Sequence, residues 1–160
     1  MKVWLIGFMG SGKSCVGELL ATHLGYGFVD SDVAICQEVG LSVGEIFSLY
    51  GDAHFRHLEA QCIARLNGLS NCVVATGGGM PLYNTLGSGV VCYLQADFEV
   101  LHARLLQDSP KRPLFTSQQA LYELYVARAP LYARLAQHII NANQPPPQVV
   151  AQILKLLDQE

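Results

Sequence analysis

The sequence contains few charged residues, no long apolar run and no internal repeat. Charged residues make up 14% of the 160 residues, and the formal net charge is −3. An acidic balance of this kind argues against a general nucleic-acid binder. No stretch approaches the ~18 consecutive apolar residues that a membrane-spanning helix needs. We therefore expect neither nucleic acid nor a membrane as a partner.

The cysteines also exclude two classes of small protein. Their number is odd, none forms a C-x-x-C pair, and they occupy positions 15, 36, 62, 72 and 92. This usage favours reduced residues of a cytoplasmic protein over a disulfide framework or a zinc site. The apolar start, Val3–Met9, is similar to a short secretory segment but lacks a small-residue cleavage site.

The clearest motif that is present lies near the N-terminus. The segment Gly7–Ser14 reads GFMGSGKS and fits G-x-x-x-x-G-K-[ST], the phosphate-binding loop. An apolar run, Val3–Ile6, precedes it as an expected buried strand, and apolar residues at helical spacing follow it. Lys13 is placed to reach the β- and γ-phosphates, and the Ser14 hydroxyl to ligate Mg²⁺. The segment predicts a nucleoside triphosphate as one ligand without naming a second substrate.

The rest of the chain alternates between expected strands and helices. Four further apolar segments read as strands, at 27–29, 72–76, 89–94 and 137–142. Helices are expected up to Gly25, from Val33, from the capping box at Ser42 to Gly51, from an Asp52 cap onwards, from an Asp97 cap, over 118–136 and towards the C-terminus. Alternation of this kind predicts an α/β fold with a parallel sheet.

Two carboxylates follow the second expected strand. In an open parallel sheet, ligands bind beyond the carboxyl ends of the strands, so Asp30 and Asp32 are expected to face the phosphate loop. Asp30 could hold Mg²⁺ through water, and Asp32 could accept a proton from a substrate hydroxyl or hold that hydroxyl in line. The alternative is that Asp30 or Ser31 only caps the helix beginning at Val33. The nearby phosphate loop favours the functional interpretation.

Two further features suit an anionic substrate. Arg56 and Glu59 lie three residues apart and share one helix face, so the glutamate could hold the arginine for capture of a carboxylate; an exposed ion pair has the same spacing. The triple glycine Gly77–Gly79 follows the third expected strand and predicts close approach of a ligand to backbone N–H groups. A flexible turn before Pro81 is the alternative. His54 and His57 lack a third ligand, so we expect no metal site there.

Two loops complete the expected site. The polar, proline-bounded segment Gln107–Leu114 breaks the helical pattern and could act as a lid that brings Arg112 onto the transferred phosphate; a plain surface loop is the alternative. The rigid segment Asn143–Pro147 follows the fifth expected strand, where an adenine could rest. Arg128 lies just ahead of Pro130.

Together these pieces resemble the shikimate kinase family over nearly the whole chain. The matching pieces occur in the family's order and at about its spacing: Gly7–Ser14, Asp30–Asp32, Phe55–Arg56 with Glu59, Gly77–Gly79, Arg112–Leu114, and Arg128 ahead of Pro130–Tyr132. The resemblance implies a three-layer P-loop kinase fold, with a five-stranded parallel sheet of order 2-3-1-4-5 between helices. It also implies a single domain over 1–160, with substrate-binding helices at about 31–67 and a lid at about 107–117.

The resemblance further implies transfer of the ATP γ-phosphoryl to the 3-hydroxyl of shikimate, with Mg²⁺ on Ser14 and, through water, Asp30. Asp32, Lys13 and Arg112 would be catalytic. Nucleotide-binding positions would be Gly10, Ser11, Gly12, Lys13, Ser14, Cys15, Arg112, Pro146 and Arg104, the nearest candidate for the family's adenine-stacking arginine. Shikimate-binding positions would be Asp32, Phe47, Phe55, Arg56, Gly77, Gly78, Gly79 and Arg128.

Other functions remain open at this point. One is a kinase of the same fold that acts on gluconate or a nucleotide; a nucleotide acceptor would need a base pocket and more lid arginines. Another is an inactive ATP-binding regulatory module, which would be expected to have lost Lys13, Asp32 or Arg112, and all three are present. We expect a cytoplasmic protein, and we expect a monomer because small members of this fold open and close a lid.

Overall fold

Five parallel strands form the centre of the fold, in the order β2-β3-β1-β4-β5. The structure is a computed structural model that describes residues 1–108 and 117–159. Its strands are β1 (Lys2–Ile6), β2 (Gly27–Asp30), β3 (Cys72–Ala75), β4 (Val90–Gln95) and β5 (His138–Asn141). The strand order and the parallel pairing confirm the predicted fold class.

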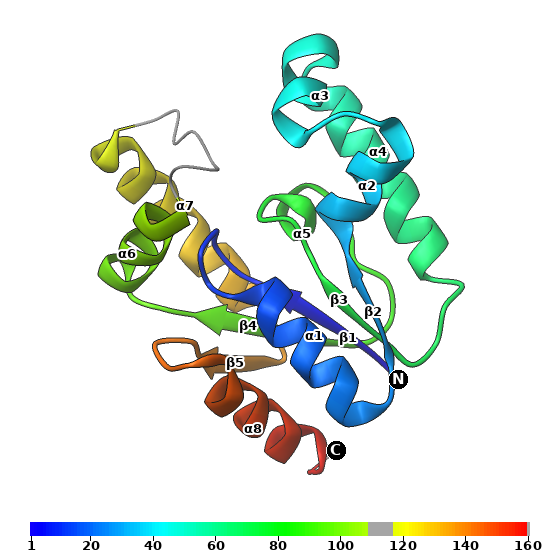
Figure 1. Cartoon of the computed structure of the whole chain (residues 1–160), viewed down its shortest axis with the longest axis vertical. Coiled ribbons are helices and arrows are strands. Elements are labelled where there is room, and N and C mark those ends of the chain that lie inside the picture. Colours follow the sequence, from blue (N-terminus) through cyan, green and yellow to red (C-terminus); the bar gives the residue numbers. More distant parts are fainter. Residues whose placement is uncertain (109–116, 160) are drawn as a thin grey trace.

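Helices connect the strands and cover both faces of the sheet (Figure 1). They are α1 (Lys13–Leu24), α2 (Ser31–Val39), α3 (Val43–Tyr50), α4 (Asp52–Leu66), α5 (Met80–Tyr83), α6 (Phe98–Asp108), α7 (Gln118–Leu135) and α8 (Pro146–Leu157). The four-residue helix α5 was not expected, because a single turn carries no periodic signal. Helix α7 continues through Pro130.

The central strand β1 shows how the sheet separates two apolar layers. Successive side chains of a strand point to opposite faces. Val3 and Leu5 are buried in one core cluster together with residues of α1 and α8. Trp4 lies in a second cluster with Val74 of β3 and residues of α2, α3 and α4. Helix α7 packs on β4, where the rings of Tyr132 and Tyr93, which both belong to the first cluster, lie 5.3 Å apart.

Two predicted caps have different outcomes. Ser42 caps α3 in a complete capping box, in which its hydroxyl accepts from the Glu45 N–H and the Glu45 carboxylate accepts from the Ser42 N–H. The prediction that Asp52 caps α4 was wrong: Gly51 occupies the cap position without a side-chain bond, and Asp52 is already in the first turn. An acid in that turn still complements the helix dipole.

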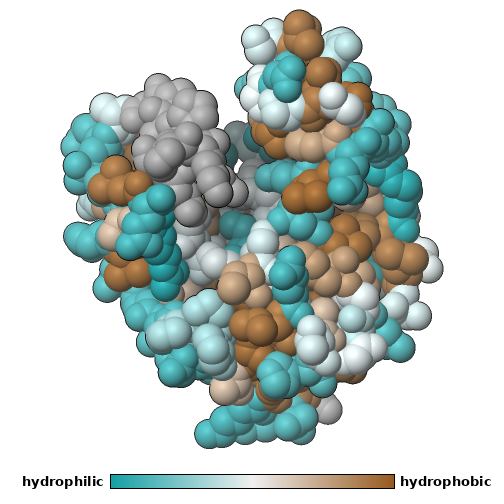
Figure 2. Space-filling model, viewed as in Figure 1, coloured by the Kyte–Doolittle hydropathy of each residue, from teal (hydrophilic) through white to brown (hydrophobic). Residues whose placement is uncertain are grey.

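The described residues contain no single helix that is long and apolar enough to cross a membrane. Only α2 and α3 taken together reach that length and apolar composition, and the chain bends by 59° between them. Both helices belong to the group α2–α4 that stands beyond the carboxyl ends of β2 and β3 (Figure 1). Figure 2 shows the surface hollowed between this group and the α6–α7 side of the molecule. The hollow therefore lies at the end of the sheet where the sequence places the site.

Candidate active site

The phosphate loop, Gly7–Ser14, begins where β1 ends and closes into the first turn of α1. Gly10 and Gly12 have φ values of 84° and 92°, which side-chain-bearing residues rarely adopt, so glycine is required for this turn. Lys13 is the first residue of α1, and its Nζ donates to the Gly7 and Phe8 carbonyls at 2.7 and 3.1 Å. The cation thus lies over the loop at a helix N-terminus, which is an anion-binding arrangement.

A cavity of about 470 Å³ extends from this loop to the carboxyl end of the sheet. We call it the nucleotide cavity, after the predicted nucleotide positions that line it. Its lining brings together most of the predicted nucleotide positions and part of the predicted acceptor site: Gly10–Cys15, Asp30, Asp32, Gly77, Gly78, Arg104 and Pro146. Gln107, Gln144, Thr76 and Val149 also line it. A single cavity therefore contacts residues expected to bind two different substrates.

Arg104 of α6 joins the phosphate loop to the loop after β5. Its Nη1 donates to the Gly10 carbonyl at 3.2 Å, and its Nη2 donates to the Ala142 carbonyl at 2.8 Å. Pro146, at the start of α8, lines the same cavity. These positions agree with an adenine between the two residues, and that contact stays a prediction.

Asp30 caps a helix, as one interpretation of the sequence predicted, and also contacts the phosphate loop; its role with Mg²⁺ stays a prediction. One carboxylate oxygen, Oδ1, caps α2 by accepting from the Val33 N–H at 3.2 Å. The other, Oδ2, accepts a hydrogen bond from the Ser14 hydroxyl. The cap starts α2 at Ser31, two residues before the expected start at Val33, and so fixes the helix that carries Asp32.

The triple-glycine turn, Gly77–Gly79, lies against the three charged side chains among the predicted acceptor-binding residues. A Cβ on Gly77 would collide with the Asp32 carboxylate. A Cβ on Gly78 would lie 3.3 Å from Arg128 Nη1, and one on Gly79 would lie 2.6 Å from Arg56 Nη1. The absence of side chains here therefore lets an acid and two guanidiniums from α2, α4 and α7 gather around one turn. We call these three side chains, Asp32, Arg56 and Arg128, the acceptor socket.

Two residues that the sequence did not assign to the site hold this turn in place. The buried Ser31 hydroxyl accepts from the Gly77 N–H at 2.9 Å. The Tyr132 hydroxyl, on a fully buried side chain, donates to the Gly78 carbonyl at 2.7 Å. Burial raises the pKa of Tyr132, against the opposing effect of nearby Arg128, so the phenol stays a donor. Tyr132 lies one helical turn after Arg128, which was the available signal in the sequence.

The predicted pair of Arg56 and Glu59 is present and is not a surface ion pair. Arg56 Nη1 lies 2.7 Å from Glu59 Oε1, and the Glu59 side chain is fully buried. The Asn84 amide also donates to that oxygen, at 3.3 Å. Burial raises the pKa of Glu59, while the Arg56 guanidinium opposes the rise. A buried carboxylate of this kind restricts where the arginine can point.

Aromatic rings surround the Arg56 guanidinium. Phe47 and Phe55, predicted to flank the substrate ring, pack with centroids 4.7 Å apart. Arg56 Cζ lies 5.7 and 5.5 Å from these two rings. A third ring, Tyr83 of α5, lies closer, with its centroid 4.0 Å from Cζ. The sequence did not assign Tyr83 to the site.

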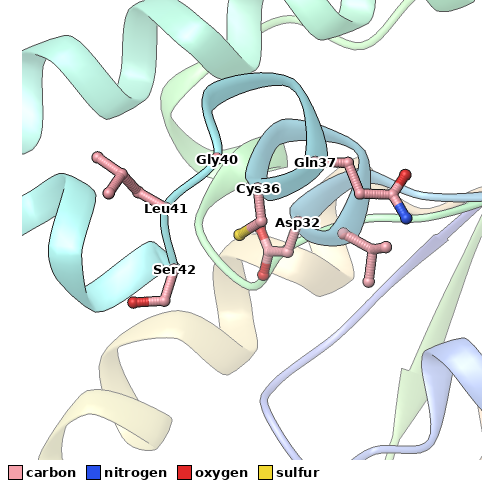
Figure 3. Close-up of a pocket in the computed structure, with 7 residues that line it drawn as sticks. Asp32, Cys36, Gln37, Gly40, Leu41 and Ser42 are labelled. Atoms are coloured by element: carbon pink, nitrogen blue, oxygen red, sulfur yellow. The ribbon is translucent and has the colours of Figure 1, made fainter.

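A second cavity of about 420 Å³ also borders Asp32 (Figure 3). Asp32 and Cys36, one turn apart on α2, face it together, opposite Leu41 and Ser42. Burial, followed by the nearby Asp32 charge, raises the pKa of the Cys36 thiol. Asp32 therefore lines both cavities, between the phosphate loop and the α2–α3 connection.

Some predicted residues lie outside this description. Arg112 and most of the expected lid fall at 109–116, beyond the described residues. Cys15 lines the nucleotide cavity but is exposed. Within the described ranges, no group of three or more His, Cys, Asp or Glu residues is arranged to hold a metal ion.

Comparison with known proteins gives a consistent result. The family model for shikimate kinase matches residues 9–158. A shikimate kinase from Gloeobacter violaceus is 44% identical, with 98% of this chain and 92% of that protein covered. One from Helicobacter hepaticus is 38% identical over 99% of this chain and 97% of its own length.

Solved structures agree with the sequence relatives. A shikimate kinase from Acinetobacter baumannii, solved in complex with shikimate, superposes with a TM-score of 0.88 at 33% identity, covering 99% of this chain and 93% of that one. A deoxyadenosine kinase from M. mycoides gives a TM-score of 0.71 at 12% identity, which shows a shared fold alone. Because the family model spans nearly the whole sequence and its relatives align over almost their full length, this chain belongs to the shikimate kinase family.

Proposed function

We propose that this protein transfers the γ-phosphoryl group of ATP to the 3-hydroxyl of shikimate, which gives shikimate 3-phosphate and ADP on the route to chorismate and the aromatic amino acids. The observation that carries the proposal is the triple-glycine turn, whose three positions each abut one member of the acceptor socket. Shikimate has one carboxylate and several hydroxyls. Two guanidiniums and one acid, placed beside a phosphate loop, complement those groups.

In this proposal the socket orients the acceptor. Arg56 and Arg128 bind the shikimate carboxylate, with a backbone N–H of Gly78 or Gly79 assisting, and Phe47 and Phe55 flank the ring. Asp32 holds the 3-hydroxyl and accepts its proton as the oxygen attacks the γ-phosphorus. Phosphoryl transfer needs little covalent chemistry from the protein, so positioning and charge stabilisation supply most of the rate.

The nucleotide half supplies the cations. Backbone N–H groups of Gly10–Cys15 bind the β- and γ-phosphates, and Lys13 exchanges its present carbonyl partners for phosphate oxygens. Arg112 would approach the transferred group from the lid. Arg104 and Pro146 would hold the adenine.

The residues near Ser14 fit Mg²⁺. Ser14 and Asp30 present hard oxygen donors that already contact each other within the nucleotide cavity. Mg²⁺ keeps several waters and needs only one or two protein ligands plus phosphates, so a site with few carboxylates suits it. Mg²⁺ bound to the Ser14 hydroxyl and, through water, to Asp30 would neutralise charge on the β- and γ-phosphates.

We also propose that the chain forms one domain over residues 1–160, acts as a monomer and works in the cytoplasm. Size-exclusion chromatography with light scattering on the purified protein tests the assembly state. A mass that matches one chain, 17.4 kDa, supports the monomer, and twice that mass contradicts it.

A coupled assay tests the function directly. ADP release is measured with ATP and Mg²⁺ in the presence of shikimate, gluconate or several nucleoside monophosphates. We expect release that depends on shikimate, with the other acceptors near background. Turnover with gluconate or a nucleotide and none with shikimate would contradict the proposal and favour another kinase of the same fold.

Replacing Gly79 by Ala tests whether the turn forms part of the acceptor site. The φ of Gly79 is −91°, which alanine adopts readily, so the effect is steric: the added Cβ would lie 2.6 Å from Arg56 Nη1 and displace the guanidinium. We expect the KM for shikimate to rise roughly tenfold or more, as for loss of a charged hydrogen bond, while the KM for ATP stays constant. The matched control is Gly44→Ala in α3, where a Cβ meets nothing closer than 4.0 Å. An unchanged shikimate KM in Gly79→Ala would show that the turn does not border the acceptor.

A further inference from the structure

Tyr83 combines high exposure with a close contact to a buried charge network. It is the last residue of α5, and the residue is 62% exposed. Even so, its ring centroid lies 4.0 Å from Arg56 Cζ, well inside the roughly 6 Å range of cation–π attraction. A mostly exposed aromatic ring gains little from burial, so the contact with Arg56 is the interaction that distinguishes this position.

The Arg56 guanidinium is a planar group whose orientation needs two restraints. Glu59 takes one edge by accepting from Nη1 at 2.7 Å. A single bond at one edge still allows the plane to rotate about that contact, and the Phe47 and Phe55 rings lie farther from Cζ than Tyr83, at 5.7 and 5.5 Å. The Tyr83 ring lies over the guanidinium and opposes such rotation. The Gly79 backbone, on the same turn that starts α5, lies close to both Nη atoms.

The next residue along the chain contacts the other member of the ion pair. Asn84 donates to Glu59 Oε1 at 3.3 Å and to the Met80 carbonyl at 3.2 Å. Tyr83 therefore contacts the arginine while Asn84 contacts the glutamate. Because Gly79 is the N-cap of α5, which begins at Met80, the triple-glycine turn continues directly into the segment that carries Tyr83 and Asn84.

We infer that Tyr83 is a positioning residue for acceptor binding: its ring fixes the plane of the Arg56 guanidinium so that the edge away from Glu59 meets the substrate carboxylate. The inference rests on the proposed function of Arg56 as a carboxylate ligand. Tyr83 acts through Arg56 and does not contact the reacting atoms. It should therefore affect shikimate binding without affecting the nucleotide or the chemical step.

Kinetics of three variants test this role. In Tyr83→Leu we expect the KM for shikimate to rise roughly three- to tenfold, the size of a partly exposed cation–π contact, with kcat and the KM for ATP unchanged. Tyr83→Phe keeps the ring face and should restore the wild-type KM. The matched control is Tyr50→Leu, an exposed tyrosine on α3 whose ring contacts His54 rather than the socket. A wild-type shikimate KM in Tyr83→Leu, or an elevated one in Tyr83→Phe, would overturn the inference.

A double-mutant cycle separates action through Arg56 from a general structural effect. In an Arg56→Ala background, Tyr83→Leu should raise the shikimate KM no further, because the ring has lost the group that it orients. A rise of the same size in both backgrounds would contradict the inference.

One readout does not depend on turnover. The Nε–Hε NMR signal of Arg56, assigned by its loss in Arg56→Ala, should be sharp and shifted by the ring current in wild type and in Tyr83→Phe. It should move and broaden in Tyr83→Leu. If wild type does not phosphorylate shikimate, the proposed function fails, whereas an Arg56 signal that is the same in wild type and Tyr83→Leu overturns the role of Tyr83.

Discussion

Replacing Asp32 by Ala should lower kcat for shikimate phosphorylation by about 10²- to 10⁴-fold, the usual contribution of a positioned general base. Asp32 lines both the nucleotide cavity and the second cavity beside α2, and it lies against the Gly77 backbone. It is thus the carboxylate of the acceptor socket that also borders the phosphate loop. ATP affinity should persist, because Lys13 and the glycines of that loop are untouched.

Steady-state kinetics and a calorimetric titration with a non-hydrolysable ATP analogue measure the two effects separately. Asp32→Asn provides a variant of nearly equal volume that cannot accept the proton. Asp52→Ala, at the start of α4, removes an acid outside the socket and should keep wild-type turnover. Full kcat in both Asp32 variants would show that another group removes the proton.

Replacing Arg56 by Ala should raise the KM for shikimate by roughly 10- to 100-fold, since a hydrogen bond to a charged group contributes about 1.5–3 kcal/mol. The expected effect is selective for the acceptor, because the Arg56 side chain contacts Glu59 and the turn at Gly79. The variant also leaves the fully buried Glu59 without its cation, and the raised pKa of that carboxyl allows it to become neutral.

The control for Arg56 lies on the same helix. Arg65 of α4 pairs with Glu38 at 2.7 Å, but the two side chains are each about half exposed. Exposed ion pairs contribute little to stability, so Arg65→Ala should leave both KM values near wild type. If Arg56→Ala raised the KM for ATP as much as that for shikimate, Arg56 would not be a specific ligand of the acceptor carboxylate.

Local patterns in the sequence were enough to predict most of the fold. The strands are short apolar runs, and the helices between them have apolar faces and recognisable ends. The order of the strands came instead from the family resemblance, and the structure confirms it. The phosphate loop and the pair of Arg56 and Glu59 depend on spacings of a few residues, which a sequence displays directly. Asp30 was harder to interpret, because one of its oxygens caps α2 while the other accepts a hydrogen bond from Ser14, a contact that no local spacing displays.

Contacts between distant residues could not be read in the same way. Ser31 holds Gly77 across 46 positions, and Tyr132 holds Gly78 across 54. Tyr83 lies on a single helical turn whose position depends on the preceding glycines, so neither the turn nor its contact with Arg56 has a periodic signature. Asp52 was assigned as a cap because its residue type suits one, yet the chain turns one residue earlier, at Gly51.

The central claim is that a cradle for polyphosphate faces a socket for a small hydroxylated acid, and a crystal structure with a non-hydrolysable ATP analogue and shikimate tests it most directly. The account predicts the Asp32 carboxylate within hydrogen-bond distance of the 3-hydroxyl, that oxygen in line with the γ-phosphorus, and Arg56 and Arg128 on the substrate carboxylate. Shikimate bound elsewhere, with these three side chains directed away from one another and from the γ-phosphoryl group, would contradict it.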